Sequence, residues 1–207
     1  MNNGYFITLE GPDGSGKTTQ QQQLAVYLEE LGYAVVCTRE PGGSPAAECI
    51  RQVLLDPQLA IVPRAETLLY LAARADHLAQ VVQPALADGK IVLCDRFSDS
   101  TLVYQGLVRG LPLAELAPLN AFASSGLEPE LTLLLDGDPL LLAERRKQRG
   151  VTDRFENEGL EFQVQVRNGF LELSKIYPQR IKVIDALQEQ DVVSAALMRE
   201  IIALVKN

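Results

Sequence analysis

Long apolar runs, a basic leader and an excess of positive charge are all missing from this 207-residue sequence. No apolar run approaches the roughly 18 residues that a membrane-spanning helix requires, so we expect no membrane span. Because the start has neither a basic leader nor a small-residue cleavage site, we expect a cytoplasmic protein. The formal charge of −8 disfavours a large nucleic-acid surface, since binding a duplex requires a basic face. Any anionic ligand must therefore be met by local arginines.

Cysteine is scarce as well. Cys37, Cys49 and Cys94 are odd in number and lack C-x-x-C spacing, so they indicate neither a disulfide framework nor a zinc site. We expect buried thiols instead. The remaining composition, 47% apolar and 22% charged residues, is ordinary for a globular protein. At this length we expect a single domain over residues 1–207.

Apolar, β-branched runs alternate with helix-length amphipathic segments along the chain. This alternation is typical of βαβ units around a parallel sheet. We predict an α/β fold of three layers, α/β/α, with a five-stranded parallel sheet. The predicted strands are Tyr5–Leu9, Ala34–Thr38, Ile91–Cys94, Leu131–Leu135 and Ile181–Ile184. The predicted helices are Thr18–Leu31, Ala46–Leu55, Arg64–Asp88, Leu113–Ser124, Pro139–Arg149, Leu160–Ile176 and Asp191–Val205.

A glycine-rich segment follows the first predicted strand and precedes the first predicted helix. Its residues fit G-x-x-x-x-G-K-[ST]: Gly11, Pro12, Asp13, Gly14, Ser15, Gly16, Lys17 and Thr18. In that context the glycines let backbone N–H groups and the helix N-terminus face a phosphate. Lys17 is predicted to neutralise β- and γ-phosphate oxygens, and the Thr18 hydroxyl to bind Mg²⁺. The sequence therefore predicts a P-loop.

A P-loop by itself does not choose between a GTPase, an ATPase motor and a small-molecule kinase. A guanine-specific GTPase would need an Asn-Lys-x-Asp segment, which the sequence lacks. The chain is also too short for a motor core with accessory domains. Four further stretches must decide, namely Thr38–Gly43, Glu66–His77, Asp95–Gly106 and Arg145–Glu158.

These stretches contain short strings in a specific order. They read Thr38-Arg-Glu-Pro-Gly-Gly43, Glu66-Thr-Leu-Leu-Tyr-Leu-Ala-Ala-Arg-Ala-Asp-His77, Asp95-Arg-Phe97, Ser100-Thr-Leu-Val-Tyr-Gln-Gly106, Arg149-Gly150, Asp153-Arg-Phe-Glu156 and Val166-Arg-Asn-Gly169. Together with the P-loop, they resemble bacterial thymidylate kinases over nearly the whole chain. The resemblance implies the P-loop NTPase fold and a homodimer. It also implies transfer of the γ-phosphoryl group from Mg-ATP to dTMP, giving ADP and dTDP for dTTP biosynthesis.

An acceptor site follows partly from position and partly from the resemblance. Arg96 comes directly after the strand that ends at Cys94, at the edge where open α/β sheets bind ligands. By resemblance, Arg96 holds the dTMP phosphate and Asp95 lies near the magnesium. Tyr70 and Arg74 are four residues apart and share a helix face; by resemblance the ring stacks on thymine and the arginine binds a base carbonyl. The resemblance adds the substrate-binding residues Asp13, Glu40, Arg51, Ser100, Thr101, Tyr104 and Gln105.

Three residues carry narrower predictions. Tyr104 would crowd the 2′ position of the sugar and so select deoxyribose. Pro41 follows Glu40 in a bond that is cis in related enzymes. His77, one turn beyond Arg74, is predicted to be a structural or surface residue and not a catalyst. Without the resemblance, the stretch at Ser100 reads as an ordinary helix start.

The resemblance implies a lid at about residues 145–158. Because the predicted P-loop contains no cation at its variable positions, we expect this lid to supply the catalytic charge. Arg149 and Arg154 flank Gly150, where a closing segment could bend. The residues from Arg145 to Lys147 could equally be a solvated basic helix end. The predicted catalytic residues are Lys17, Asp95, Arg96, Arg149 and Arg154.

Two rival functions remain open. One is a P-loop kinase that acts on another nucleotide or nucleoside, which turnover of different acceptors would distinguish. The other is an ATP-binding regulator that has lost turnover. The presence of Lys17, Thr18, Asp95 and Arg96 favours an active kinase over that regulator.

Overall fold

Five parallel strands form a sheet in the order β2-β3-β1-β4-β5. The computed structural model describes residues 4–147 and 158–206, with the side chains of residues 146 and 147 left out. The strands are β1 (Tyr5–Glu10), β2 (Val35–Arg39), β3 (Ile91–Asp95), β4 (Leu131–Asp136) and β5 (Ile181–Asp185). Each strand runs one residue further at its carboxyl end than the apolar pattern predicts. In all five cases that extra residue is charged, so hydrophobicity alone could not include it.

The helices follow the predicted segments closely. They are α1 (Lys17–Glu30), α2 (Pro45–Leu55), α3 (Pro63–His77), η1 (Leu78–Val82), α4 (Gln83–Ala87), α5 (Ser98–Thr101), η2 (Leu102–Val108), α6 (Leu113–Ser124), α7 (Pro139–Lys147), α8 (Gly159–Ile176) and α9 (Gln190–Val205). The predicted helix at residues 64–88 is one helical run in which a wider π-type stretch, η1, lies between α3 and α4. Pro84 lies just after η1, and its ring and missing N–H disfavour α-helical geometry in the turn before it. The helical pair α5 and η2 lies where the sequence predicted only a helix start at Ser100, without bounds.

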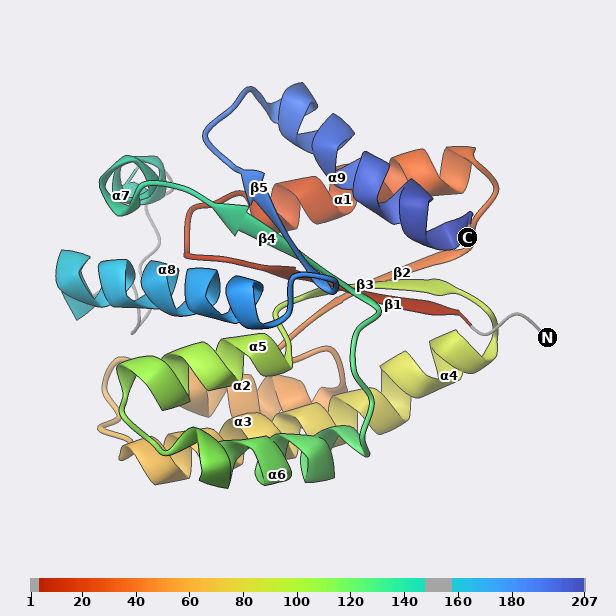
Figure 1. Cartoon of the computed structure of the whole chain (residues 1–207). Coiled ribbons are helices and arrows are strands. Elements are labelled where there is room, and N and C mark those ends of the chain that lie inside the picture. Colours follow the sequence, from red (N-terminus) through yellow and green to blue (C-terminus); the bar gives the residue numbers. More distant parts are fainter. Residues whose placement is uncertain (1–3, 148–157, 207) are drawn as a thin grey trace.

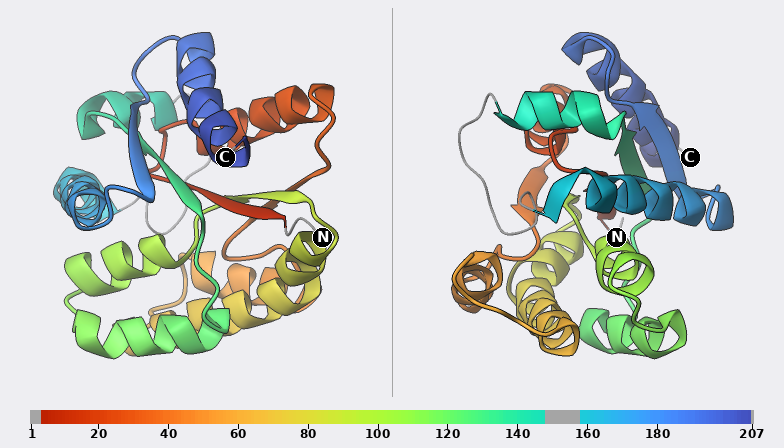
Figure 2. Two further views of the ribbon diagram at one scale, coloured as in Figure 1. Left: turned by 45° about the vertical axis from the view of Figure 1, so that its right-hand side comes forward. Right: turned by 90° about the vertical axis from the view of Figure 1, so that its left-hand side faces the viewer.

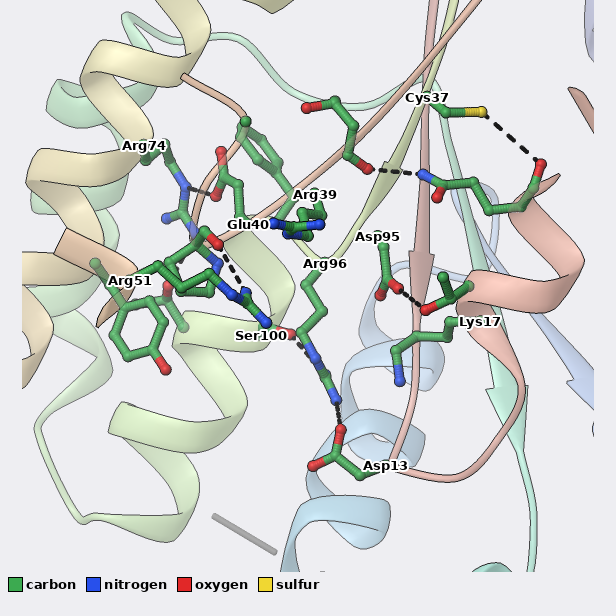
Figure 3. A pocket seen from close by; sticks show the side chains of 18 of the residues that line it. Asp13, Lys17, Cys37, Arg39, Glu40, Arg51, Arg74, Asp95, Arg96 and Ser100 are labelled. Atoms are coloured by element: carbon green, nitrogen blue, oxygen red, sulfur yellow. Dashed lines mark hydrogen bonds and ion pairs between the residues drawn. The ribbon is translucent and has the colours of Figure 1, made fainter. Parts of the chain in front are cut away.

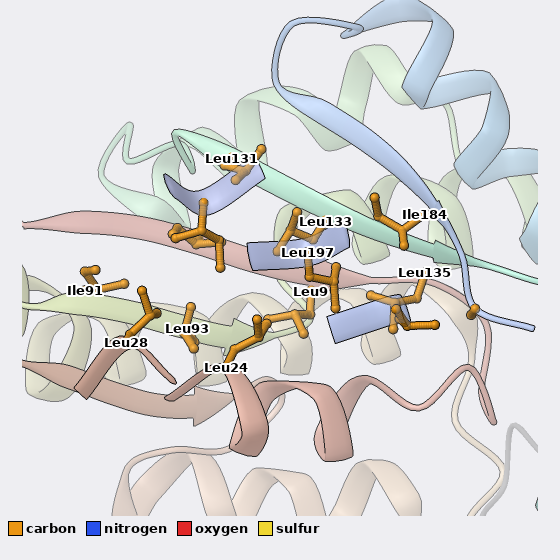
Figure 4. Packing of buried hydrophobic residues seen from close by; sticks show 14 residues of the cluster. Leu9, Leu24, Leu28, Ile91, Leu93, Leu131, Leu133, Leu135, Ile184 and Leu197 are labelled. Atoms are coloured by element: carbon orange, nitrogen blue, oxygen red, sulfur yellow. The ribbon is translucent and has the colours of Figure 1, made fainter. Parts of the chain in front are cut away.

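Helices cover both faces of the sheet (Figure 1). Helices α1 and α9 lie on one face, and the further views place α8 and the helices α2 to α6 on the other (Figure 2). Odd-numbered residues of the central strands, such as Leu9 and Leu133, pack with Leu24, Leu28 and Leu197 beneath α1 and α9 (Figure 4). Even-numbered residues face η1, η2 and α8. The predicted three-layer fold with a five-stranded parallel sheet is confirmed.

The order of the strands determines where a ligand can bind. The chain leaves β1 for the β2 and β3 side, and then crosses to β4 and β5 on the other side. The carboxyl end of β1 is therefore the point at which the winding reverses, and open α/β sheets bind ligands at this point.

The prediction of buried thiols holds for one of the three cysteines. Cys94 is buried as expected, but the prediction is wrong for Cys37 and Cys49, which are exposed. Cys37 lies on the edge strand β2 and Cys49 on the surface helix α2, so an apolar neighbourhood in sequence did not guarantee burial.

Among the described helices, none combines the length and apolarity needed to cross a bilayer.

Candidate active site

The P-loop connects β1 to α1 at the reversal point. Gly11, Gly14 and Gly16 all have positive φ angles, between 88° and 134°. At Gly11 a side chain is also excluded by space, because an added Cβ would lie 2.3 Å from the Leu135 carbonyl oxygen. Ser15 Oγ is buried and has no hydrogen-bond partner among the residues that the structure describes. A buried hydroxyl of this kind needs a partner, and a phosphate oxygen is a suitable one.

Lys17 opens α1 and is buried, with its Nζ donating to the carbonyl oxygens of Gly11 and Pro12, both at 3.0 Å. Burial, together with the neighbouring Arg96, lowers the pKa of Lys17 to about 8. Both effects disfavour the charged ammonium, and a bound phosphate would favour it. Asp95, Asp13 and Glu10 offset part of this effect, but burial outweighs them.

Thr18 and Asp95 meet across two elements, since Thr18 Oγ1 donates to Asp95 Oδ2 at 2.9 Å. Thr18 is on α1, and Asp95 ends β3 on the sheet face that α1 covers. A hydroxyl and a carboxylate are the hard oxygen ligands that suit Mg²⁺. No group of three or more metal-ligating side chains occurs within the described residues. A magnesium ion here would need phosphate oxygens and water to complete its shell.

Arg96 occupies the wall between the P-loop and the rest of the cavity (Figure 3). Its Nη2 donates to Asp13 Oδ1 at 2.7 Å and its Nη1 to Ser100 Oγ at 3.1 Å. The guanidinium lies over the Tyr104 ring, 5.2 Å from its centroid. The φ angle of Arg96 is +71°, a left-handed conformation that non-glycine residues adopt chiefly where the surroundings impose it, and often at active sites.

Arg74 is 2% exposed and is held on three sides. Its Nε donates to Glu40 Oε2 at 2.8 Å, its Nη1 to Asn120 Oδ1 at 2.5 Å and its Nη2 to Thr101 Oγ1 at 3.1 Å. The other carboxylate oxygen of Glu40 lies 3.0 Å from His77 Nδ1. Glu40, itself part of the cavity wall, thus orients Arg74. His77 is fully buried and also bonds Thr38, which agrees with a structural position.

A cavity of about 580 Å³ brings the predicted acceptor residues together. Its volume lies within the range of small-molecule sites. Tyr70 reaches it from α3, and Gln105, from η2, is held by a 2.9 Å bond to Glu66 Oε1. The wall contains Asp13, Lys17, Thr18, Glu40, Arg51, Tyr70, Arg74, Asp95, Arg96, Ser100, Thr101, Tyr104 and Gln105.

Arg51 and Pro41 form the side of this cavity next to α2. Arg51 Nη1 donates to the Pro41 carbonyl oxygen at 2.7 Å. The bond between Glu40 and Pro41 is cis, as the resemblance suggested.

The sequence-based prediction missed Glu10, a fully buried carboxylate at the end of β1. Glu10 accepts hydrogen bonds from the Phe97 N–H at 2.7 Å and from Ser100 Oγ at 2.6 Å. Burial, reinforced by Asp99, raises the pKa of Glu10 to about 7. The signal for it was an acidic residue ending an otherwise apolar run directly before a P-loop.

A second cavity, also missed, lies on the other side of the P-loop. It measures about 290 Å³ and is lined by Gly14, Ser15, Gly16, Thr19, Gln20, Arg145 and the segment 186–190. Arg145 Nη1 donates to the Ala186 carbonyl oxygen at 2.7 Å, so this arginine fastens α7 to the segment after β5. The predicted lid arginines Arg149 and Arg154 lie outside the described residues.

The chain is similar to thymidylate kinases by three comparisons. The family model described as thymidylate kinase matches residues 9–197. A thymidylate kinase from Deinococcus radiodurans is 49% identical over 95% of this chain and 96% of its own, and one from Syntrophotalea carbinolica is 54% identical over 88% of each. A crystal structure of thymidylate kinase from Ehrlichia chaffeensis matches with a TM-score of 0.80 at 34% identity. It covers 96% of this chain and 99% of that one.

Proposed function

Because the chain belongs to the thymidylate kinase family, which phosphorylates dTMP with ATP, we propose that the 580 Å³ cavity is its dTMP site. One observation carries the proposal. The P-loop side chains Asp13 and Lys17, the arginine Arg96 and the base-sized platform of Tyr70 and Arg74 all line the same cavity. A phosphate held at Arg96 therefore faces the cradle in which the γ-phosphate of ATP is expected.

The chemistry needs no general base. The attacking oxygen belongs to the dTMP phosphate, which is ionised at neutral pH, so the protein has to supply positive charge and alignment. Lys17 and Arg96, which both line the cavity, supply this charge. A planar guanidinium can bind two phosphate oxygens at once, and Asp13 and Ser100 fix the plane of Arg96.

We assign Mg²⁺ to Thr18 and Asp95, whose oxygens are already in contact. When bound, the ion neutralises charge on the phosphates of ATP. We assign the nucleoside of ATP to the 290 Å³ cavity, because the P-loop glycines separate that cavity from the dTMP site. Donor and acceptor would then meet end to end over Lys17.

Tyr104 supports a preference for deoxyribose. Its ring packs against Phe162 and Phe170, with centroids 6.1 and 6.2 Å away, so it cannot easily retreat from a bulkier sugar. Replacing Tyr104 with alanine is expected to lower the ratio of activity on dTMP to that on its ribose analogue. An unchanged ratio would count against this role.

The lid arginines Arg149 and Arg154 are proposed to meet charge that develops in the transition state. Alanine at either position should lower kcat far more than it weakens dTMP binding, since such a contact is made chiefly in the transition state. Single-turnover kinetics with both substrates saturating measures the effect, and Lys147→Ala is the control. If Arg149→Ala and Arg154→Ala both match the parent, the catalytic cation lies elsewhere.

A homodimer is proposed from the resemblance and from an exposed apolar strip on α3 and α6. Phe122 is 86% exposed, and Leu119 precedes it by three residues on the same side of α6. Leu68 is exposed on the neighbouring α3. Phe122→Ser should reduce the mass measured by light scattering towards that of one chain. The matched control is Val26→Ser, at an exposed position on α1, and it should leave the measured mass unchanged.

An acceptor panel tests the whole proposal. Turnover with Mg-ATP should be fastest with dTMP among dTMP, dUMP, UMP, CMP, AMP and thymidine. A higher rate with another acceptor would favour a kinase of different specificity. Release of ADP that stays flat with every acceptor would favour the ATP-binding regulator. Both free nucleotide substrates are consistent with a cytoplasmic enzyme.

A further inference from the structure

The Glu10 carboxylate joins two segments that meet at the active site. Glu10 ends β1 and directly precedes the P-loop, and its acceptor contacts all come from the segment after β3. These donors are the Phe97 N–H at 2.7 Å, Ser100 Oγ at 2.6 Å and, more weakly, the Ser100 N–H at 3.3 Å. Arg96, the residue before Phe97, is thereby tied to the strand that begins the phosphate cradle.

The contact with Ser100 has a direction. A serine hydroxyl has one proton and two acceptor lone pairs. If the Ser100 hydroxyl donates its proton to Glu10 Oε2, its lone pairs face Arg96. Arg96 Nη1 then donates to Ser100 Oγ at 3.1 Å. A glutamine at position 10 could turn an N–H towards Ser100 and reverse that hydroxyl. Its proton would then point towards the Arg96 guanidinium.

A neutral side chain would suit stability better at this position. Glu10 is fully buried, and an ionised carboxylate is costly to bury even beside a partner. Its nearest cationic atom, Arg96 Nη1, is 4.0 Å away, and Asp99 adds repulsion. The rise in the pKa of Glu10 to about 7 reflects that cost.

We propose that Glu10 is a positioning residue: its carboxylate orients the Ser100 hydroxyl and so aims the Arg96 guanidinium at the acceptor phosphate. The inference rests on the role proposed above for Arg96. Glu10 itself lies beneath the cavity wall and does not line the cavity. Its effect should therefore appear in the rate of transfer and not in the affinity for ATP.

Steady-state kinetics of the full chain tests this with Glu10→Gln, which preserves shape and removes the charge. The expected result is a fall in kcat of roughly 10- to 100-fold, as for a small misalignment of a reacting group, with the KM for ATP changed by less than about twofold. Glu130→Gln is the matched control. Glu130 also accepts a backbone N–H from β1, that of Phe6 at 2.7 Å, but it is exposed and outside both cavities.

Two further variants separate the possible failures. Arg96→Ala should lose more activity than Glu10→Gln; if it keeps the kcat of the parent, the role of Arg96 fails and the inference fails with it. If Arg96→Ala is impaired but Glu10→Gln matches the parent, only the inference fails. A Glu10→Gln protein that does not fold by circular dichroism overturns it too, because Glu10 would then be a stability residue. Losses in Glu10→Gln and Ser100→Ala should be non-additive, and additive losses would contradict action through Ser100.

Discussion

The two faces of the sheet are built from alternate residues of the same strands, yet the strand side chains that they bury differ in polarity. On the face beneath α1 and α9, the buried side chains of the three central strands are apolar: Ile7, Leu9, Ile91, Leu93, Leu131, Leu133 and Leu135. On the other face, Thr8 Oγ1 lies 2.8 Å from Thr132 Oγ1, and Thr132 bonds Asp99 Oδ2 at 3.1 Å. Arg180 completes this buried set with bonds to both oxygens of Asp99, at 2.6 and 2.8 Å. Glu10 lies on the same face, close enough to Asp99 for the two charges to repel, and it accepts the Ser100 hydroxyl at 2.6 Å.

This difference suggests separate sources for the stability of the fold and for the position of the helices on the sheet. Burial of apolar surface is favourable but has no direction, so it does not fix where a helix lies along the sheet. Hydrogen bonds are directional, and a fully bonded buried network has few alternative arrangements. Asp99 is on α5, which also carries Thr101 and adjoins Tyr104. We infer that the polar network sets the position of the acceptor site, while apolar burial on both faces supplies most of the stability.

Lys17→Ala should have the largest effect. It tests whether activity can be lost while the stability of the fold is kept. The substitution removes the cradle's cation, so kcat should fall by more than about 100-fold. Because burial disfavours the lysine's charge, thermal unfolding should shift little. Activity assays and calorimetry on one preparation measure both. Retained activity would reject the cradle assignment.

Leu133→Ala should do the reverse. Leu133 is fully buried in the apolar cluster, and truncating such a residue costs about 2–5 kcal/mol through lost burial and a residual cavity. Urea unfolding measures the loss, and kcat per folded molecule should remain that of the parent. A fall in kcat comparable to that of Lys17→Ala would break the division between the two faces.

Glu10 should make the polar face sensitive to pH. Its pKa is about 7 in the folded protein and 4.5 in the unfolded chain, so the folded state holds the extra proton between those values. Stability should therefore fall as pH rises through that window, by about 3 kcal/mol in total. Other groups facing Glu10 also influence its charge: Lys17, Cys94, Arg96, Asp99, Tyr104 and Arg180.

Comparing the stability of Glu10→Gln with that of the parent at each pH removes the contributions of the other titrating groups. In urea unfolding, the stability of the variant relative to the parent should increase from pH 5 to pH 8. A relative stability that stays constant, or decreases, would show that ionisation of Glu10 does not destabilise the folded protein.

Thr132→Val should have the smallest effect and is the matched partner of Leu133→Ala, one residue away and facing the other side. It keeps the side chain's shape but leaves the Thr8 hydroxyl without its 2.8 Å partner, at a cost of about 1–3 kcal/mol. The KM for dTMP should rise, because Thr132 supports Asp99 on α5. If Leu133→Ala raises that KM as much, position does not depend on the polar face.

Sequence alone indicated the fold and the cradle because both depend on local patterns. The periodicity of apolar residues indicated the strands and helices. The glycines indicated the P-loop, because its backbone takes a conformation, at Gly11 above all, that only glycine adopts easily. The charged ends of the strands were missed because they break the apolar pattern, and these ends carry Glu10 and Asp95.

Only the tertiary structure decided which polar groups meet. Glu10 and Ser100 are 90 residues apart, and Asp99 and Arg180 are 81 apart, so no spacing along the chain could reveal either contact. The second cavity likewise combines the P-loop with the segment after β5. The sequence determined which residues could form an active site. The pairing of the parallel strands, which brings distant carboxyl ends to one edge, determined which residues do.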